Sequence, residues 1–436
     1  MEVIKKNILL LSTGDTNGAY EYVFRLSKVL IRDGHKVVML VKNKSKYDDF
    51  LIQYNLKYVP PKHKFFLKIL NKIKSIFVGK RKTNIDYDLN YDFISRDEKS
   101  ENVSIDRIIE QINFIPDFVF VGMTDFFMNS TDLYNLYLKT NSKIYNISVD
   151  MNHFTGGCHY AWDCLGYING CGDSCPAILS EDFKGIAKVN FNKKIENAHK
   201  GNFRILTGSG WTLKQSKESK IYKHQKNFYN INSLIDTEIL NNRNKDISKR
   251  IFNLNNKDFY ILMGSQNNNA KRKGFDYLVE SLKLLYLELN EFERERIQIL
   301  IVSRTNSSNF KEIPFKKKYL PYIKDYKLLS LLYQASNLFV NSSIEDSGPM
   351  MVTEALACGT PVVGFDMGVV NNMVVNDYNG YKAKLGDTKD LMFGINKIFK
   401  LNEIDYLEYS NNAALHVENF SSFNYASKIL RDLLQD

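Results

Sequence analysis

The stretch of sequence that decides the fold is 341–368, NSSIEDSGPMMVTEALACGTPVVGFDMG. An apolar strand leads into it, and its acidic turn is followed by a helix, a Gly-Thr-Pro turn and a second apolar strand. This order predicts a strand–helix–strand unit of a parallel α/β sheet. Because such sheets bind ligands in the loops at the carboxyl ends of their strands, we expect the acidic turn to lie at a ligand site.

The polar groups of this stretch suit an anionic ligand that carries hydroxyl groups. Three backbone N–H groups are expected at the helix N-terminus, where the dipole and the unpaired donors favour anions: those of Gly348, Met350 and Met351. Pro349 matches the preference of proline for the first helical turn. Glu354, inside the helix, can accept hydrogen bonds from two sugar hydroxyls. The alternative is that Glu345 and Asp346 only cap the helix and that Glu354 lies on an exposed face.

The rest of the chain repeats this alternation of strands and helices. A first α/β series is expected from four segments: a strand over 7–11, a turn over 12–18, a helix over 19–31 and a strand over 36–41. A polar region over about 212–258 interrupts the pattern, and a second series starts at Phe259. Because 436 residues exceed what one hydrophobic core usually spans, we predict two Rossmann-like domains facing a central cleft rather than one large domain. We expect the first to cover residues 1–235 and the second residues 236–415.

The composition indicates a globular protein whose excess charge lies in one segment. With 44% hydrophobic residues the chain is neither disordered nor fibrous. Its net charge is 59 − 49 = +10, and eight of the positive charges fall within 60–82, which has no acidic residue. The remainder of the chain therefore carries only 10 − 8 = +2.

That segment predicts a basic amphipathic helix over 63–78, with aromatic and aliphatic residues on one face and lysines on the other. We expect 62–82 to bind an anionic membrane surface; the alternative is a surface helix with its apolar face on the domain core. No nucleic-acid recognition motif accompanies the charge, so no nucleic-acid partner is expected. Nor does any run approach the roughly 18 apolar residues that span a bilayer, and the first apolar run is short for a signal peptide. A cytoplasmic protein, peripheral at the inner face of the membrane, is predicted.

Two glycine-containing turns are candidates for contact with phosphates. Met263-Gly264 ends a strand, and the run Lys271-Arg272-Lys273-Gly274 opens a helix. Lysines at a helix N-terminus oppose the dipole, so a merely solvated helix start is not favoured. In the first series, Gly18 ends a turn in which a ligand can approach the backbone closely.

Four cysteines crowd into the segment 150–176, DMNHFTGGCHYAWDCLGYINGCGDSCP: Cys158, Cys164, Cys171 and Cys175. Without an export signal, thiols are expected rather than disulfides. Their spacing, C-x5-C-x6-C-x3-C, is not that of a standard zinc ribbon but is compatible with a structural zinc site; the alternative is reduced thiols packed in a Gly-rich loop. A catalytic zinc is not expected, because four thiolates would leave no open coordination position.

The stretch 341–368 resembles the donor-site signature of retaining glycosyltransferases of family 4 (group 1), which have the two-domain GT-B architecture. In that family an acidic residue precedes a Gly-containing loop and a second Glu follows eight positions later, as Asp346 and Glu354 do here. Glu345, however, stands three residues before Gly348, as the family's first Glu does. The resemblance therefore implies that either Glu345 or Asp346 orients the donor sugar and that Glu354 holds the nucleotide ribose.

The phosphate loop and the cysteine segment extend the resemblance. Lys273 matches the lysine that neutralises the diphosphate, and Lys271 or Arg272 would replace the family's arginine, whose position holds Asn268. The run Thr-Gly-Gly-Cys-His-Tyr resembles a motif of one subgroup of the same transferases, in which further cysteines follow it. Many relatives place a catalytic His directly before the Asp that matches Asp150, where this chain has Val149. The role of that His is then dispensable or has moved to His153 or His159, and the motif favours His159.

The resemblance implies a hexosyltransferase-type enzyme that retains the anomeric configuration and needs no catalytic metal ion. The donor is a nucleotide diphosphate-sugar, and the acceptor is an oligosaccharide, which we expect to be lipid-linked and to serve cell-surface polysaccharide synthesis. Residues 416–436 should form a helix that returns to the first domain. The candidate catalytic residues are Lys273, Asp346, Glu345, His159 and Asp150, and the candidate donor-binding residues are Gly18, Gly264, Lys271, Arg272, Ser347, Gly348, Pro349, Met350, Met351 and Glu354. Two alternatives stay open: a nucleotide-sugar epimerase or hydrolase on the same architecture, and a non-catalytic membrane-associated scaffold.

Overall fold

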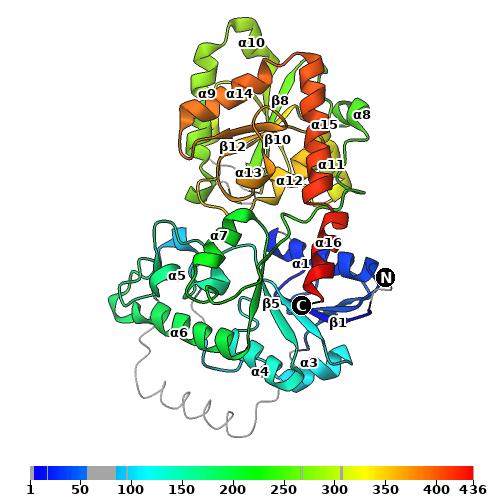
Figure 1. Cartoon of the computed structure of the whole chain (residues 1–436). Coiled ribbons are helices and arrows are strands. Elements are labelled where there is room, and N and C mark those ends of the chain that lie inside the picture. Colours follow the sequence, from blue (N-terminus) through cyan, green and yellow to red (C-terminus); the bar gives the residue numbers. More distant parts are fainter. Residues whose placement is uncertain are drawn as a thin grey trace.

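A computed structural model describes residues 4–16, 18–55, 85–94, 97–265, 267, 269–304 and 308–435 of the chain. The helix predicted over 63–78 and the whole basic segment 60–82 therefore lie outside the described residues. The described residues form two α/β domains, each built around one sheet, and the two domains lie one above the other in Figure 1. The predicted fold class, two Rossmann-like domains, is confirmed.

The first domain contains a seven-stranded parallel sheet in the order β3-β2-β1-β4-β5-β6-β7. Its strands are β1 (Asn7–Ser12), β2 (Lys36–Val41), β3 (Leu51–Gln53), β4 (Phe118–Val121), β5 (Lys143–Ser148), β6 (Arg204–Thr207) and β7 (Tyr229–Asn230). Its helices are α1 (Gly18–Arg32), α3 (Ile105–Ile112), α4 (Ser130–Thr140), α5 (Gly166–Asn169), α6 (Gly185–Lys200) and α7 (Gly210–Glu218).

Helices cover both faces of this sheet because its central strands β1 and β4 carry unbroken apolar runs, over 8–11 and 118–121. In β1, Ile8 and Leu10 pack in one core cluster with side chains of α1, whereas Leu9 and Leu11 pack in another with side chains of α3, α4 and α6. Successive side chains of a strand point to opposite faces, so an unbroken apolar run needs cover on both. The polar loops are thereby left at the strand ends.

The second domain contains a six-stranded parallel sheet in the order β10-β9-β8-β11-β12-β13. Its strands are β8 (Phe259–Ser265), β9 (Ile297–Ser303), β10 (Lys316–Leu320), β11 (Leu338–Asn341), β12 (Val362–Phe365) and β13 (Gly380–Ala383). Its helices are α8 (Lys245–Ile251), α9 (Phe275–Glu288), α10 (Glu291–Arg296), α11 (Tyr326–Ala335), α12 (Met350–Ala357), α13 (Gly368–Met373), α14 (Thr388–Phe399) and α15 (Glu403–Phe420). In both sheets the first strand of the domain is central, which is the order of Rossmann-like folds.

The chain ends with a helix that lies against the first domain. α15 packs on the second domain, the chain turns at Ser421 and Ser422, and α16 (Phe423–Leu433) lies beside α1 (Figure 1). Leu430 and Leu433 join the apolar cluster that contains Leu26 of α1. The chain therefore passes between the two domains twice, once between β7 and α8 and once between α15 and α16.

Several element ends differ from the predicted ones for local reasons. The strand predicted over 7–11 extends to Ser12, and the helix predicted over 19–31 spans Gly18–Arg32. α11 begins at Tyr326 because the Asp325 side chain accepts the Leu328 N–H and caps the helix. The polar region over 212–258 contains most of α7, the short strand β7 and all of α8. The sequence did not predict these elements, because the region is rich in Asn and Lys. In the described ranges, no helix is long and apolar enough to span a bilayer.

Candidate functional site

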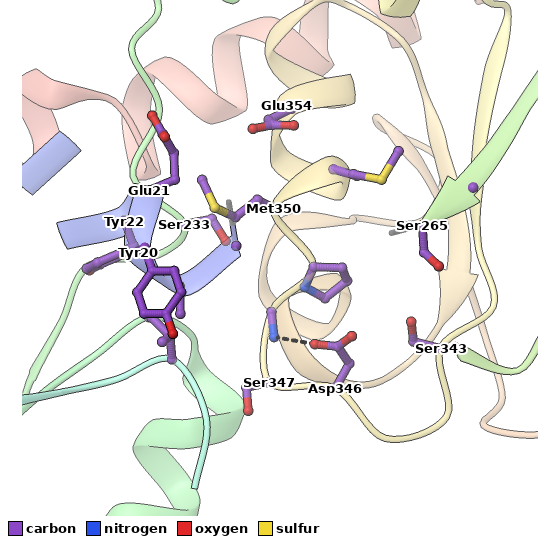
Figure 2. A pocket seen from close by; sticks show the side chains of 18 of the residues that line it. Tyr20, Glu21, Tyr22, Ser233, Ser265, Ser343, Asp346, Ser347, Met350 and Glu354 are labelled. Atoms are coloured by element: carbon purple, nitrogen blue, oxygen red, sulfur yellow. Dashed lines mark hydrogen bonds between the residues drawn. The ribbon is translucent and has the colours of Figure 1, made fainter. Parts of the chain in front are cut away.

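A cavity of about 1140 Å³ lies between the two domains and is lined by residues of both. From the first domain come the start of α1 and the loops that follow several strands; from the second come the loops after β8 and β11 and the start of α12. Figure 2 shows Tyr20 and Glu21 of the first domain on the left of this pocket and Asp346 and Ser343 of the second domain on its right. The carboxyl ends of the two sheets thus meet at one cavity.

Thirteen of the fifteen predicted catalytic and donor-binding residues line this cavity. They are Gly18, Asp150, His159, Gly264, Arg272, Lys273, Asp346, Ser347, Gly348, Pro349, Met350, Met351 and Glu354. The other two, Lys271 and Glu345, do not line it. Pro349 stands at the N-cap of α12 and Met350 is its first helical residue, so the proline precedes the first turn instead of belonging to it.

Asp346 is held between two cations of the basic loop. Arg272 Nη1 lies 2.8 Å from Asp346 Oδ2, and Lys273 Nζ contacts the same oxygen. The backbone N–H of Gly348 donates to the other oxygen, Oδ1, over 3.3 Å (Figure 2). Burial alone would raise the pKa of Asp346, but Lys273 and Arg272 hold it below its usual value. The carboxylate is therefore ionised, and one wall of the cavity carries two cations beside one anion.

The basic loop is fixed against the acidic turn by its backbone. Gly274 has a φ of +61°, and a Cβ at this position would lie 2.0 Å from the carbonyl oxygen of Ser342. The carbonyl oxygen of Arg272 accepts the N–H of Ile344 over 2.8 Å. Only glycine allows this close approach, which brings Lys273 to Asp346. Burial lowers the pKa of Lys273, and the Asp346 carboxylate opposes that shift.

Glu345 points away from the cavity, although it is the neighbour of Asp346. Its carboxylate accepts the backbone N–H of Trp162, a first-domain residue with a φ of +50°. Burial raises the pKa of Glu345 to about 7. Of the two acidic residues that the sequence left as alternatives, Asp346 is therefore the one placed at the cavity.

Glu354 is buried on α12 and receives hydrogen bonds from two sides. Arg25 Nη2, from α1 of the first domain, lies 3.0 Å from Oε1, and the Tyr333 hydroxyl donates to Oε2 over 3.1 Å. Neither Arg25 nor Tyr333 was predicted as a site residue. An arginine within a helix and a tyrosine in an apolar helix carry no local signal of this role.

The first-domain wall holds a buried histidine between two carboxylates. His159 Nδ1 lies 2.9 Å from Asp150 Oδ2, and its Nε2 lies 3.3 Å from Asp125 Oδ2. Burial acts to raise the pKa of Asp150, but the charge and the hydrogen bond of His159 lower it to about 2. Of the two candidate histidines, His159 lines the cavity, whereas His153 does not and contacts the carbonyl oxygen of Gly122. Asp125 was not predicted; its place just after the apolar strand β4 is the signal that could have found it.

Aromatic residues of the cysteine segment cover the basic loop from the first domain. The guanidinium of Arg272 lies 4.2 Å from the ring centre of Tyr160, and Lys271 Nζ lies 5.7 Å from that of Trp162. Such contacts between a cation and an aromatic ring are favourable, more so when they are desolvated. Lys271 therefore serves the contact between the domains in this structure.

The four cysteines of this segment lie near one another as thiols. Cys158 and Cys175 share a hydrogen bond, and a Cβ on Gly166 would lie 3.3 Å from the Cys164 sulfur and 3.4 Å from the Cys171 sulfur. In the part of the chain that the structure describes, no three His, Cys, Asp or Glu side chains are arranged to hold a metal ion. The zinc site thus stays a prediction from the spacing.

The second domain matches a known family. Residues 244–416 match the family of glycosyl transferases group 1. The match lies within the second domain and includes the basic loop, the acidic turn and Glu354.

Individual proteins resemble the chain over part or all of its length. An uncharacterized glycosyltransferase of Haemophilus influenzae is 24% identical over 155 residues, which cover 34% of this chain and 42% of that protein. Sucrose-phosphate synthase of Thermosynechococcus elongatus has a TM-score of 0.64 at 14% identity, over 99% of this chain and 98% of its own. Anabaena Alr3699/HepE, solved in complex with UDP and glucose, has a TM-score of 0.63 at 12% identity, over 99% and 100% of the two chains. These structures share the fold with this chain.

Proposed function

We propose that the protein transfers a sugar from a nucleotide diphosphate-sugar to a hydroxyl of an oligosaccharide acceptor, with retention at the anomeric carbon. One observation carries the proposal: Lys273, Arg272, Asp346 and Glu354 line one wall of a two-domain cavity whose other wall holds Asp150 and His159. The complex of Anabaena Alr3699/HepE with UDP and glucose supports a nucleotide-sugar as donor.

The second-domain wall would bind the donor and stabilise the leaving group. Lys273 and Arg272 would exchange part of their contact with Asp346 for the diphosphate, whose negative charge grows as the bond to the sugar breaks. The first N–H groups of a helix have no partner within it, so those at the start of α12 would add donors. Asp346 would then orient the sugar hydroxyls, and Glu354 would accept the ribose hydroxyls.

The first-domain wall would position the acceptor and the sugar. The two carboxylates beside His159 keep its ring in one orientation. To donate to a hydroxyl of the transferred sugar, Nε2 would exchange its 3.3 Å contact with Asp125 for that hydroxyl, while Nδ1 would stay on Asp150. Gly18, at the start of α1, would allow the diphosphate or the acceptor to approach the backbone. No divalent metal ion is required in this scheme, since the cations of the basic loop supply the positive charge.

The test is sugar transfer from radiolabelled nucleotide-sugars, chosen by a thermal-shift screen of UDP-, GDP- and ADP-sugars. Label should move to an oligosaccharide acceptor, in the presence of EDTA as well as in its absence. Rapid consumption of the donor without acceptor would instead support an epimerase or hydrolase. Failure of every nucleotide to bind in calorimetry, with vesicle binding intact, would support a scaffold.

We also propose that the acceptor is lipid-linked, serves cell-surface polysaccharide synthesis, and is met at the inner face of the membrane. The support is the sequence of 62–82, with its basic residues and its apolar face. The protein should sediment with vesicles containing phosphatidylglycerol and remain in the supernatant with phosphatidylcholine vesicles. Equal sedimentation with both, or with neither, would contradict the proposal.

A further inference from the structure

We propose that Arg25 is a donor-positioning residue, which holds the Glu354 carboxylate from the first domain in the orientation that accepts the ribose of the donor. The inference rests on the proposed function and adds to it a residue outside the donor domain. Arg25 would act through Glu354 and not on the reacting atoms.

The geometry at Glu354 leaves room for a ligand while fixing the carboxylate. Arg25 holds Oε1 at 3.0 Å and the Tyr333 hydroxyl holds Oε2 at 3.1 Å. Each carboxylate oxygen can accept more than one hydrogen bond, so both keep acceptor capacity for two hydroxyl groups. Glu354 lines the cavity, where these hydroxyls would arrive.

Arg25 itself has little freedom to move. Its Nη1 donates to the carbonyl oxygen of Leu234 over 3.0 Å, its Nε lies 3.5 Å from Glu21 Oε1, and its guanidinium lies 4.8 Å from the ring centre of Tyr326. The residue is only 4% exposed. A buried guanidinium is tolerated when its donors are paired, and its planar fork then aims each N–H in a fixed direction. The pairing therefore preorganises Glu354.

The same network reaches the turn at which α1 begins. Glu21, one helical turn before Arg25, pairs with Lys46 over 2.7 Å. The backbone N–H of Lys46 donates to Asp15, in the turn that ends at Gly18. The ribose carboxylate of the second domain and the Gly18 turn of the first are thus joined by consecutive hydrogen bonds and ion pairs.

Loss of Arg25 should affect the ribose and spare the rest of the donor. Without the guanidinium, Glu354 keeps one partner, Tyr333, and its buried charge lacks compensation. The carboxylate would turn away from this position, and the ribose hydroxyls would lose an acceptor. Contacts of the diphosphate with Lys273 and Arg272 would be unchanged.

The experiment compares ribose and deoxyribose nucleotides in calorimetry. The probe is whichever of UDP, GDP and ADP binds the wild-type protein, together with its 2′-deoxy and 3′-deoxy forms. The wild type should bind the ribonucleotide at least about tenfold more tightly than one or both deoxy forms, as expected for loss of a hydrogen bond to a charged group. Arg25→Ala and the uncharged, polar Arg25→Gln should lose this preference, while Arg25→Lys should keep part of it.

The matched control is Arg32→Ala. Arg32 lies on the same helix, but its guanidinium contacts Asn424 and Ser427 near the surface, so the ribose preference should persist. A double variant with Glu354→Gln should lose no more preference than either single variant. Equal weakening of ribose and deoxyribose binding in the Arg25 variants, or no weakening, would overturn the role of Arg25 while leaving the proposed function intact. Absence of nucleotide binding by the wild type would overturn the proposed function itself.

Discussion

The two domains place their polar residues at the same structural position, the carboxyl ends of parallel strands, but they assemble them differently. In the second domain, Arg272 and Asp346 are 74 residues apart in the sequence. They lie in two loops that follow strands of one sheet, and these loops lead into α9 and α12. In the first domain, His159 comes from an irregular segment, and Arg25 meets a residue 329 positions away. The loops of the donor wall therefore come from one domain, but its Glu354 is held by Arg25 of the other domain, whereas His159 is held by two carboxylates of its own domain.

Replacing the central cation of the donor wall should have the largest effect. We expect Lys273→Ala to reduce sugar transfer by at least about 100-fold, because a buried charge that stabilises the leaving group would be lost. Lys271→Ala is the matched control, since this lysine faces Trp162 and does not line the cavity. Full transfer activity in Lys273→Ala would contradict the assignment of Lys273 to the site that binds the donor.

The opposite wall is tested at its histidine. His159→Ala should lower transfer by about 10- to 100-fold, as expected for a positioned hydrogen-bond donor. His153→Ala should lower it much less, because His153 does not line the cavity. A melting curve of each variant separates lost folding from lost chemistry. If His159→Ala transfers sugar as fast as His153→Ala and the wild type, His159 takes no part in the reaction.

The cysteine segment tests whether a metal ion stabilises the first-domain wall. The spacing predicts about one zinc per chain in elemental analysis, lost in Cys171→Ser together with about 5 °C of melting temperature. Cys358→Ser is the control, because this cysteine is buried in the second domain, away from the segment. Five titratable thiols and no zinc in freshly purified protein would contradict the prediction and support packed thiols.

Glu345, which lies at the contact between the two walls, should make the stability of the folded protein depend on pH. Its pKa is about 7 in the folded protein against an ordinary value of 4.5, so the folded state binds the proton more tightly. Stability should therefore fall as the pH rises from about 4.5 to 7, by at most about 3 kcal/mol. Denaturant unfolding of the wild type and of Glu345→Gln should show this slope in the wild type alone. Parallel pH profiles would show that Glu345 ionises normally.

Much of the donor domain could be predicted from the sequence because its determinants are local. The strand and helix periods, the Gly274 turn and the spacing from Asp346 to Glu354 all lie within short segments. The opposite wall was predicted in part: Asp150 and His159 line the cavity, while Asp125, Tyr160 and Arg25 were not predicted. Their roles arise from contacts between segments far apart in the chain, which no local pattern records.

The sequence by itself determined the two-domain α/β architecture, because apolar strands alternating with helices can bury both faces only in parallel sheets. It also determined which residue types collect at the strand ends of the second domain. Only the tertiary structure decided between Asp346 and Glu345: the turn after β11 directs one carboxylate to Lys273 in the cavity and the other to the backbone of Trp162. Likewise, only the packing of α1 against α12 joins Arg25 to Glu354. The reason is physical: the direction of a side chain in a turn is set by the neighbours that fill the space around it, and those neighbours come from the whole chain.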